Sequence, residues 1–483
     1  MGPESYLGPY CLRRFLEDLM SEVKLEKAFK SRDVLAMAFG SMIGWGWIML
    51  SGTWAVEAGM LGAILGYAIG AIMCIFVGLA YAELTPMLPC TGGSVVYAFK
   101  AMGFWPAAVA GLATAFAYLG VAAWEGPAFA TSIDYIVEIP KAVYLWTIEG
   151  YDVYLSWVLV AVACAVILTW INYKGAQMAA IFQTVATLCI IVIGVIFVFG
   201  STVYGDVENT KPYFTNTQGF MSVLLMVPAM FVGFDVIPQC AGEMNVPLKK
   251  IPRLLIVSII AAAGWYMLMI FATCMSAPES VRIEGTIPVA DCMAYAFGGT
   301  IWGKVCIVGA LCGIITSWNG FLFSAARCIY AMANARILPV GLAKLHPKYK
   351  TPYRAILLCG GTSVGACFVG SGALSWFVNA SSFGVVITYL MSVLAFIVLR
   401  KRQPNLNRPY KIKAFAPVAV LAVMTVIFFA YLYLPTGPSS LVGVEWCMVL
   451  AWFILGLLVA AYCKVKYRDV TDVQREELLV GKP

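Results

Sequence analysis

The sequence has few charged residues, a single histidine and no closely spaced cysteine pair. Charged residues make up 12% of the 483 residues and hydrophobic residues 61%, whereas soluble domains carry about a quarter charged residues. His346 is the sole histidine, so proton relay by imidazole within a membrane has no residue to use. The 15 cysteines form no C-x-x-C, so we expect no metal or disulfide role. This composition indicates an integral membrane protein.

Features of several other classes are also missing. We find no set of His, Cys or paired carboxylates at a membrane face, which argues against an enzyme and against any metal or other cofactor. No basic patch interleaved with aromatic residues points to nucleic acid. A channel would need a continuous polar stripe. A nutrient sensor derived from a transporter remains a less favoured alternative, because the tail after residue 464 is too short for an output domain.

Apolar runs of about 20 residues can cross a bilayer about 30 Å thick. Residues 1–31 contain no cleavable apolar core, so we expect no signal peptide to be removed. The sequence predicts an all-α integral membrane fold with twelve transmembrane helices, near residues 33–56, 60–82, 95–130, 153–171, 176–200, 218–240, 254–276, 300–332, 354–371, 374–399, 414–434 and 442–463.

The distribution of lysine and arginine predicts the orientation. If the N-terminus is cytoplasmic, only Lys141, Lys211, Arg282 and Lys304 of the 32 basic residues lie at or near the outer face. The positive-inside rule then places both termini in the cytoplasm, in a multi-pass protein of the cell (plasma or inner) membrane. The net charge of +7 favours anionic lipid headgroups as neighbours. Residues 10–30 are expected to form either an amphipathic helix on the inner surface or a partly ordered tail.

The first span contains three glycines within seven residues, Gly40, Gly44 and Gly46. Glycine weakens a helix, and open backbone survives at membrane depth only where it lines a polar cavity or meets a ligand. We therefore expect this helix to break and to form a binding site. The half-helix that resumes near Trp47 would turn its N-terminal amides toward a carboxylate. A kink or a close helix crossing is the alternative.

The sixth span repeats this pattern with Pro228, Gly233 and Asp235 in its middle. A second helix is therefore predicted to break. Asp235 is expected to accept hydrogen bonds from backbone amides, or else to belong to a gate or proton site.

The two predicted breaks occupy matching positions in two blocks of five spans. Because five is odd, the second block enters the membrane upside down, and interrupted helices in inverted halves point to a secondary transporter. The predicted organisation comprises a cytoplasmic segment (1–31), a first repeat (32–203), a second repeat (217–400), two peripheral helices (412–463) and a cytoplasmic tail (464–483).

Glu125 places a carboxylate in the otherwise apolar third span. An ionisable group there costs a few kcal/mol and usually faces a cavity. The alternative is that the span ends early and that Glu125 lies in water near the outer mouth.

Five groups of residues, in order along nearly the whole chain, resemble motifs of the amino acid/polyamine/organocation (APC) superfamily of permeases. They are Gly40 to Gly46; Tyr81-Ala82-Glu83-Leu84 through Pro89 and Gly92-Gly93; Gly233-Phe234-Asp235 followed by Glu243, Asn245, Pro247 and Lys249-Lys250-Ile251-Pro252; Ser324-Ala325-Ala326-Arg327 through Tyr330 to Leu338-Pro339, with His346-Pro347 and Thr351-Pro352; and Arg408-Pro409-Tyr410.

This resemblance implies a LeuT-type fold, a 5+5 inverted repeat with broken helices 1 and 6 that transports an amino acid or a related amine by alternating access. Amides of the first break would hold the substrate carboxylate, and carbonyls of both breaks its α-amino group. The implied substrate-binding residues are Ser41, Met42, Ile43, Gly44, Trp45, Gly46, Tyr118, Glu125, Ala229, Met230, Phe231, Gly233 and Phe321. The implied coupling or gating residues are Glu125, Gln177, Asp235, Ser324 and Trp45.

The chain departs from the family pattern at three positions. Trp45 and Trp47 stand where relatives usually carry a small and an aliphatic residue, and Ala229 stands where an aromatic gate often lies. We hypothesise that a tryptophan of the first span takes over part of the lid or that the pocket is remodelled. Alternatively, both indoles pack against neighbouring helices.

The role of Glu125 affects both the predicted class of substrate and the predicted coupling ion. It could pair with a cationic substrate, which is favoured, or carry a proton while the substrate is a neutral or aromatic amino acid. Gln177 stands where many relatives have a lysine, which leaves sodium coupling open, although proton symport or exchange is favoured. Ser324 and Ser317 offer hydroxyl ligands. The loop 131–152 has no cysteine, which argues against a disulfide-linked heavy chain as partner.

Overall fold

The computed structural model describes residues 25–481, which fold almost entirely into helices. The longer helices are α2 (Ser31–Met42), α3 (Gly46–Ala58), α4 (Met60–Met87), α5 (Ser94–Met102), α6 (Phe104–Ile136), α7 (Leu155–Lys174), α8 (Ala176–Tyr204), α9 (Thr217–Met230), α11 (Ile251–Ser276), α13 (Pro288–Ala296), α14 (Thr300–Asn334), α15 (Tyr353–Cys367), α16 (Leu374–Arg402), α17 (Phe415–Tyr433), α18 (Gly443–Lys466) and α19 (Asp472–Val480). The short helices are α10 (Val236–Gln239), α12 (Glu279–Glu284), η1 (Val207–Thr210), η2 (Ala241–Glu243), η3 (Leu248–Lys250), η4 (Val340–Ala343) and η5 (Ser371–Ala373).

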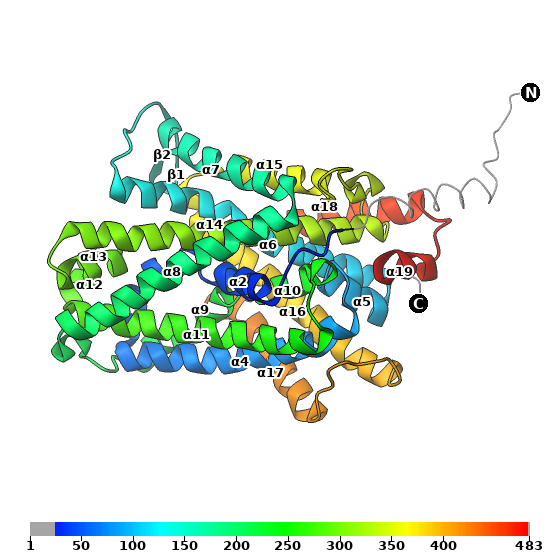
Figure 1. The fold of residues 1–483 in the computed structure, drawn as a ribbon, viewed down its shortest axis with the longest axis horizontal. Helices are drawn as coiled ribbons and strands as arrows, with labels where there is room; N and C mark the ends of the chain where they lie inside the picture. The colour runs from blue at the N-terminus through cyan, green and yellow to red at the C-terminus, as the bar shows by residue number, and fades with distance from the viewer. Residues whose placement is uncertain (1–24, 482–483) are drawn as a thin grey trace, which may run out of the picture.

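The long helices run approximately along the long axis of the molecule (Figure 1). Helices α6 and α14 pack against each other and are the most deeply buried of the long helices. Helices α4 and α11 form one flank and α7 and α15 the other, while α2 and α10 lie in the middle (Figure 1). The segments in which the sequence predicts a break, α2–α3 and α9–α10, are therefore enclosed by the other helices.

Nine of the described helices are long and apolar enough to cross a membrane, and the bent pair α2 and α3 forms a tenth. The other predicted spans fall on helices that are shorter than a bilayer requires, because α9 has 14 residues and α15 has 15. The structure thus supports an all-helical membrane protein with nine or ten spans. The count of twelve and the inverted repeat stay predictions.

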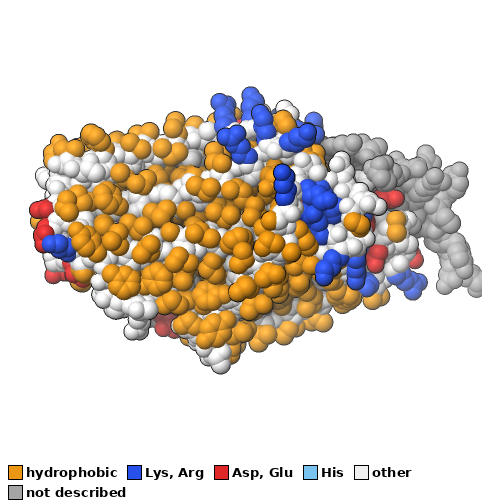
Figure 2. Space-filling model, turned by 90° about the horizontal axis from the view of Figure 1, so that it is seen from below, with side chains coloured by type: hydrophobic (Ala, Val, Ile, Leu, Met, Phe, Trp, Pro, Cys, Tyr) orange, Lys and Arg blue, Asp and Glu red, His pale blue; other side chains and the backbone are white. Residues whose placement is uncertain are grey.

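Figure 2 shows apolar side chains covering most of one face of the molecule, with lysines and arginines gathered toward one end. We call this the basic end; helices α7, α16 and α18 carry lysines or arginines in their last turns, namely Lys174, Arg400, Lys401, Arg402, Lys464 and Lys466. A band of apolar surface bounded by a basic end is what the positive-inside rule describes.

The N-terminal segment differs from the predicted amphipathic helix where it can be compared. Residues 10–24 lie outside the described residues, and residues 25–30 form no helix. Instead, the Phe29 amide donates to the Glu243 carbonyl (3.1 Å) and the Phe29 carbonyl accepts from the Asn245 amide (2.8 Å). Glu243 also forms a buried ion pair with Arg327 on α14 (2.8 Å). These contacts connect the start of α2 and the end of α10 to the central helix α14.

Two ordered regions were not predicted. Within the loop that follows α6, β1 (Tyr144–Ile148) and β2 (Tyr151–Tyr154) form an antiparallel hairpin. In the tail, α19 begins at a capping box in which Thr471 accepts from the Gln474 amide. Lys100 on α5 pairs with Glu476, so the tail packs against the helical bundle.

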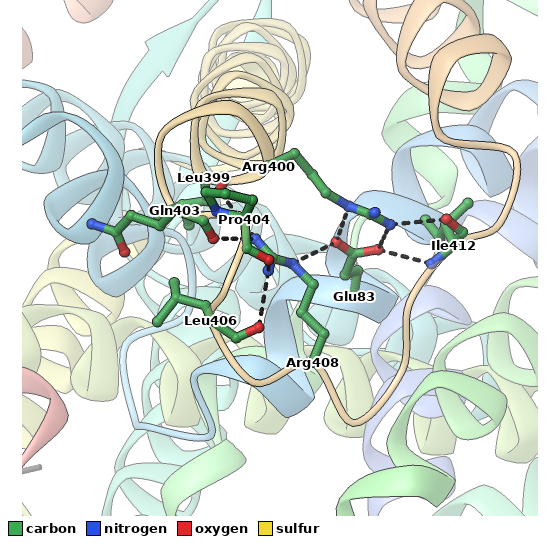
Figure 3. Close-up of polar contacts among 8 residues, drawn as sticks. All are labelled: Glu83, Leu399, Arg400, Gln403, Pro404, Leu406, Arg408 and Ile412. Atoms are coloured by element: carbon green, nitrogen blue, oxygen red, sulfur yellow. Dashed lines mark hydrogen bonds and ion pairs between the residues drawn. The ribbon is translucent and has the colours of Figure 1, made fainter.

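A polar cluster connects the end of α4 to the 403–412 loop between α16 and α17 (Figure 3). Glu83, buried on α4, accepts from Arg400 Nε (2.6 Å) and from the Ile412 amide (2.9 Å). Arg408 Nε lies 3.2 Å from the same carboxylate and its other nitrogens donate to carbonyls of the loop. One carboxylate thus positions two guanidinium groups and a loop.

Candidate functional site: a cavity between two interrupted helices

The first interruption separates α2 from α3, which meet at an angle of 49° across residues 43–45. A Cβ atom added to Gly44 would lie 2.9 Å from Glu125 Oε1 and 3.0 Å from Ser317 Oγ, and one added to Gly46 would lie 2.6 Å from Met230 Sδ. Because α6, α9 and α14 all approach the open backbone this closely, a side chain at either position would have to displace Glu125, Ser317 or Met230. The predicted break in the first span is confirmed.

The second interruption lies between α9 and α10. Gly233 has a φ of 134°, and a Cβ atom there would meet the Met42 amide nitrogen at 2.8 Å. The two interruptions thus touch each other. Asp235 accepts hydrogen bonds from the Gly233 amide (3.0 Å) and from the Tyr118 hydroxyl (2.7 Å). Its carboxylate therefore caps the turn, which agrees with the interpretation that Asp235 accepts hydrogen bonds from backbone amides.

Polar backbone groups of both interruptions are left open. Among the described residues, the amides of Gly44 and Trp45 have no hydrogen-bond acceptor. Within residues 25–481, no donor meets the carbonyls of Ala229 and Met230. The amide of Gly233, which would follow Ala229 in the helical order, turns instead to Asp235. Unpaired backbone groups at this depth are costly. They can be satisfied by a ligand with an acidic and a basic group.

A small cavity, of about 20 Å³, lies between the two interruptions. Its wall includes eight of the residues expected from sequence, namely Ser41, Met42, Gly44, Trp45, Gly46, Ala229, Met230 and Phe321. Four further lining residues were not predicted, namely Val121, Trp124, Val232 and Tyr266, and Ser317 was expected only as a hydroxyl ligand for coupling. Except for the two serine hydroxyls, the Tyr266 hydroxyl and the indole N–H groups of Trp45 and Trp124, the side chains in the wall are apolar.

The other expected binding residues surround the cavity without lining it. Ile43 is fully buried, and Phe231 packs near the Tyr67 ring (6.1 Å between centroids). Tyr118 packs beside Phe321 (5.4 Å) and donates to Asp235. Gly233 forms the contact between the two interruptions. These residues pack around the residues that line the cavity and do not contact the cavity themselves.

Glu125 is fully buried in α6, which continues to Ile136. The alternative in which the span ends early and Glu125 lies in water is therefore wrong. Ser317 donates to Glu125 Oε1 at 2.5 Å, while Oε2 has no partner among the described residues. No basic side chain of the described part of the chain pairs with it. An uncompensated buried charge is strongly unfavourable, so this carboxylate needs either a proton or a cation.

Carbonyls of α2 near the interruption are met by side chains of other helices. The Tyr266 hydroxyl donates to the Met42 carbonyl (3.0 Å) and the Thr316 hydroxyl to the Gly40 carbonyl (3.1 Å). Gln183 on α8 accepts from Asn319 on α14 (2.8 Å), and its own amide lies 3.4 Å from the Ala36 carbonyl. A buried amide network thus holds α2 against α8 and α14.

Only one of the residues expected to take part in coupling or gating, Trp45, lines the cavity. Gln177 is exposed at the start of α8 and is not brought to the cavity; the buried glutamine that faces α2 is Gln183. Ser324 is buried on α14, outside the cavity wall. Trp45 lines the cavity, whereas Trp47 packs edge-on against Trp265 (5.7 Å). A sequence signal for Gln183 does exist, since it is a polar residue inside an apolar run.

Comparison with known proteins adds independent information. The model of a family described as "Amino acid permease" matches residues 29–459. The branched-chain amino acid permease of Bacillus subtilis is 25% identical over 94% of this chain and 97% of its own. The methylthioribose transporter of the same species is 26% identical over 92% and 95%, respectively. A chloroplastic cationic amino acid transporter of Arabidopsis thaliana is 25% identical over 90% and 74%.

Proposed function

Because this chain belongs to the amino acid permease family, whose members are transporters and not enzymes, we propose that it moves a neutral, apolar amino acid across the membrane by alternating access. The observation that carries the proposal is the set of open backbone groups on both sides of one cavity. Free amides at Gly44 and Trp45 suit a carboxylate, and free carbonyls at Ala229 and Met230 suit an ammonium group.

The apolar wall supports the choice of side chain. Val121, Val232 and Phe321 line the cavity. Glu125 does not line it and is hydrogen-bonded to Ser317, which does. A substrate side chain held there would meet apolar and aromatic surface, and its burial would contribute about 25 cal/mol per Å². In this proposal Glu125 is a proton carrier, which favours proton symport or exchange.

The cationic substrate preferred from the sequence remains a second candidate. Its support is the unpartnered Oε2 of Glu125, because the carboxylate lies next to Gly44 in the cavity wall. A lysine-like ammonium group that reached this oxygen would offset the cost of burying the charge.

We further propose that the interruptions divide the chain into two inverted repeats, residues 32–203 and 217–400, with α17 and α18 outside them. The closely similar placement of α2–α3 and of α9–α10 in the two blocks supports this division. The basic end (Figure 2) supports cytoplasmic termini in a cell membrane.

Uptake into proteoliposomes tests both candidates. The neutral-substrate proposal predicts that leucine or phenylalanine, and not lysine or arginine, competes for uptake, and that an inward proton gradient drives accumulation. Glu125→Gln should abolish accumulation driven by the gradient while substrate exchange continues. Glu57→Gln, which changes a carboxylate on α3 that bonds Ser222 away from the cavity, is the matched control. Selective uptake of lysine that Glu125→Gln abolishes would establish the second candidate instead.

A further inference from the structure

A second cavity, of about 340 Å³, lies where α7 meets α8, at the end of α7 that carries Lys174. It is separate from the cavity between the interrupted helices and shares no residue with it. Its lining residues are Glu26, Lys174, Gly175, Gln177, Met178, Ile181, Lys348 and Tyr349. The proposed transport function gives this cavity no role.

The two lysines of this cavity are held by aromatic groups and not by carboxylates. Lys174 Nζ donates to the Tyr349 hydroxyl (3.1 Å) and lies 5.1 Å from the centroids of both the Trp170 and the Tyr349 rings. Lys348 Nζ lies 5.5 Å from the Tyr349 centroid. The hydrogen bond from Lys174 lowers the pKa of Tyr349, as a positive environment would.

Both ammonium groups lack an anionic partner among the described residues. Glu26 lines the same cavity, but neither lysine forms an ion pair with it or with another carboxylate in residues 25–481. By contrast, the largely buried side chains of Arg327, Arg400 and Arg408 are each paired with a carboxylate. The two lysines therefore leave positive charge available for an anion.

The wall of the cavity continues into the apolar surface of α8. Met178 and Ile181 line the cavity, and Val185 and Leu188 follow them on the same helical face, with 65% and 61% of their surfaces exposed. This spacing of three and four residues forms one continuous stripe. In a membrane-spanning helix, such a stripe contacts acyl chains.

We propose that this cavity binds the phosphodiester headgroup of an anionic phospholipid, with Lys174 and Lys348 on the phosphate and an acyl chain along the α8 stripe. A basic pocket beside a transmembrane helix is the kind of site that acidic lipid headgroups occupy. The apolar stripe begins inside the cavity, which favours a lipid over free phosphate, because a soluble anion would make no use of Met178 and Ile181. The site is independent of the identity of the transported substrate.

Binding is tested on the purified full-length protein in detergent by thermal unfolding and by native mass spectrometry with added phosphatidylglycerol, phosphatidylcholine of the same acyl chains, or inorganic phosphate. We expect phosphatidylglycerol alone to raise the unfolding temperature. Lys174→Gln and Lys348→Gln should each weaken its binding about fivefold, and the double variant about 25-fold.

Two variants control for charge. Lys401→Gln removes an exposed positive charge on α16, away from the cavity, and should leave lipid binding unchanged. Replacing both Lys174 and Lys348 by arginine should retain most of it. Equal binding of phosphatidylglycerol to the double glutamine variant and the wild type would overturn the proposal. A stabilisation that inorganic phosphate reproduces would overturn the assignment to a lipid and indicate a soluble anion.

Discussion

Gly44 shows how a single residue without a side chain determines the geometry of the candidate site. It lies in the wall of the cavity and in contact distance of both Glu125 and Ser317. Because the carboxylate and the hydroxyl come from α6 and α14, the absence of one Cβ atom lets three helices meet at one point. The Glu125 carboxylate and the open amide of Gly44 consequently lie close together, and Gly44 lines the cavity while Glu125 does not.

Gly44→Ala should impair transport because its methyl group would lie 2.9 Å from Glu125 Oε1. Overpacking of this kind costs about 1–3 kcal/mol, so we expect leucine uptake at subsaturating concentration to fall about tenfold or more. Gly264→Ala is the matched control, since nothing lies within 4 Å of a Cβ atom added there on α11. Equal losses for the two variants would contradict a specific role for Gly44.

Trp45 lines the cavity while Trp47 is packed against Trp265. If the Trp45 indole forms part of the lid, Trp45→Ser should weaken substrate affinity about tenfold with little change in thermal stability, since aromatic side chains that cover a ligand contribute strongly to binding. Trp45→Phe should retain part of that affinity. Competition binding and thermal unfolding measure the two effects, and unchanged affinity and specificity in Trp45→Ser would exclude the lid.

At the scale of elements, the helix ends are held by buried charged groups. Glu83 at the end of α4 contacts two arginines and one backbone amide of the α16–α17 connection (Figure 3). Buried charges of this kind are strongly interdependent, because removing one partner leaves the others unpaired in a medium of low polarity. The position of this connection therefore depends on one side chain of α4.

Glu83→Gln should destabilise the protein by about 3–5 kcal/mol, visible as a lower apparent unfolding temperature in detergent. The exposed pair Lys211–Glu208 provides the control, because water already screens this pair and Glu208→Gln should change stability little. A Glu83→Gln variant as stable as Glu208→Gln would show that the cluster contributes little.

At the scale of the whole molecule, the apolar surface and the basic end predict how the protein lies in the membrane. Lys401 lies in the last turn of α16, on the predicted cytoplasmic side, and Lys211 lies in the loop before α9, on the predicted outer side. In intact cells, a membrane-impermeant maleimide should label Lys211→Cys and not Lys401→Cys, and it should label both after permeabilisation. Wild-type protein measures the background from its own cysteines. Labelling of Lys401→Cys in intact cells would reverse the proposed orientation.

The sequence by itself determined the class of the protein and the positions of both interruptions. Apolar runs of membrane-spanning length and glycine or proline within them act locally, since each acts through the backbone of its own helix. Thus Gly44 and Gly233 lie in the two interruptions, as predicted, whereas Gly40 lies within α2 and Gly46 begins α3. The family resemblance was recognisable for the same reason, because its motifs are short and contiguous.

Only the tertiary structure decided which side chains from other helices complete the site. Tyr266, Trp124 and Val121 come from α11 and α6, and nothing in their own neighbourhood distinguishes them from residues of an apolar core. The choice of Gln183 over Gln177 depends on which face of α8 packs against α2. Such choices follow from helix packing between distant segments, which a local pattern of residues does not specify.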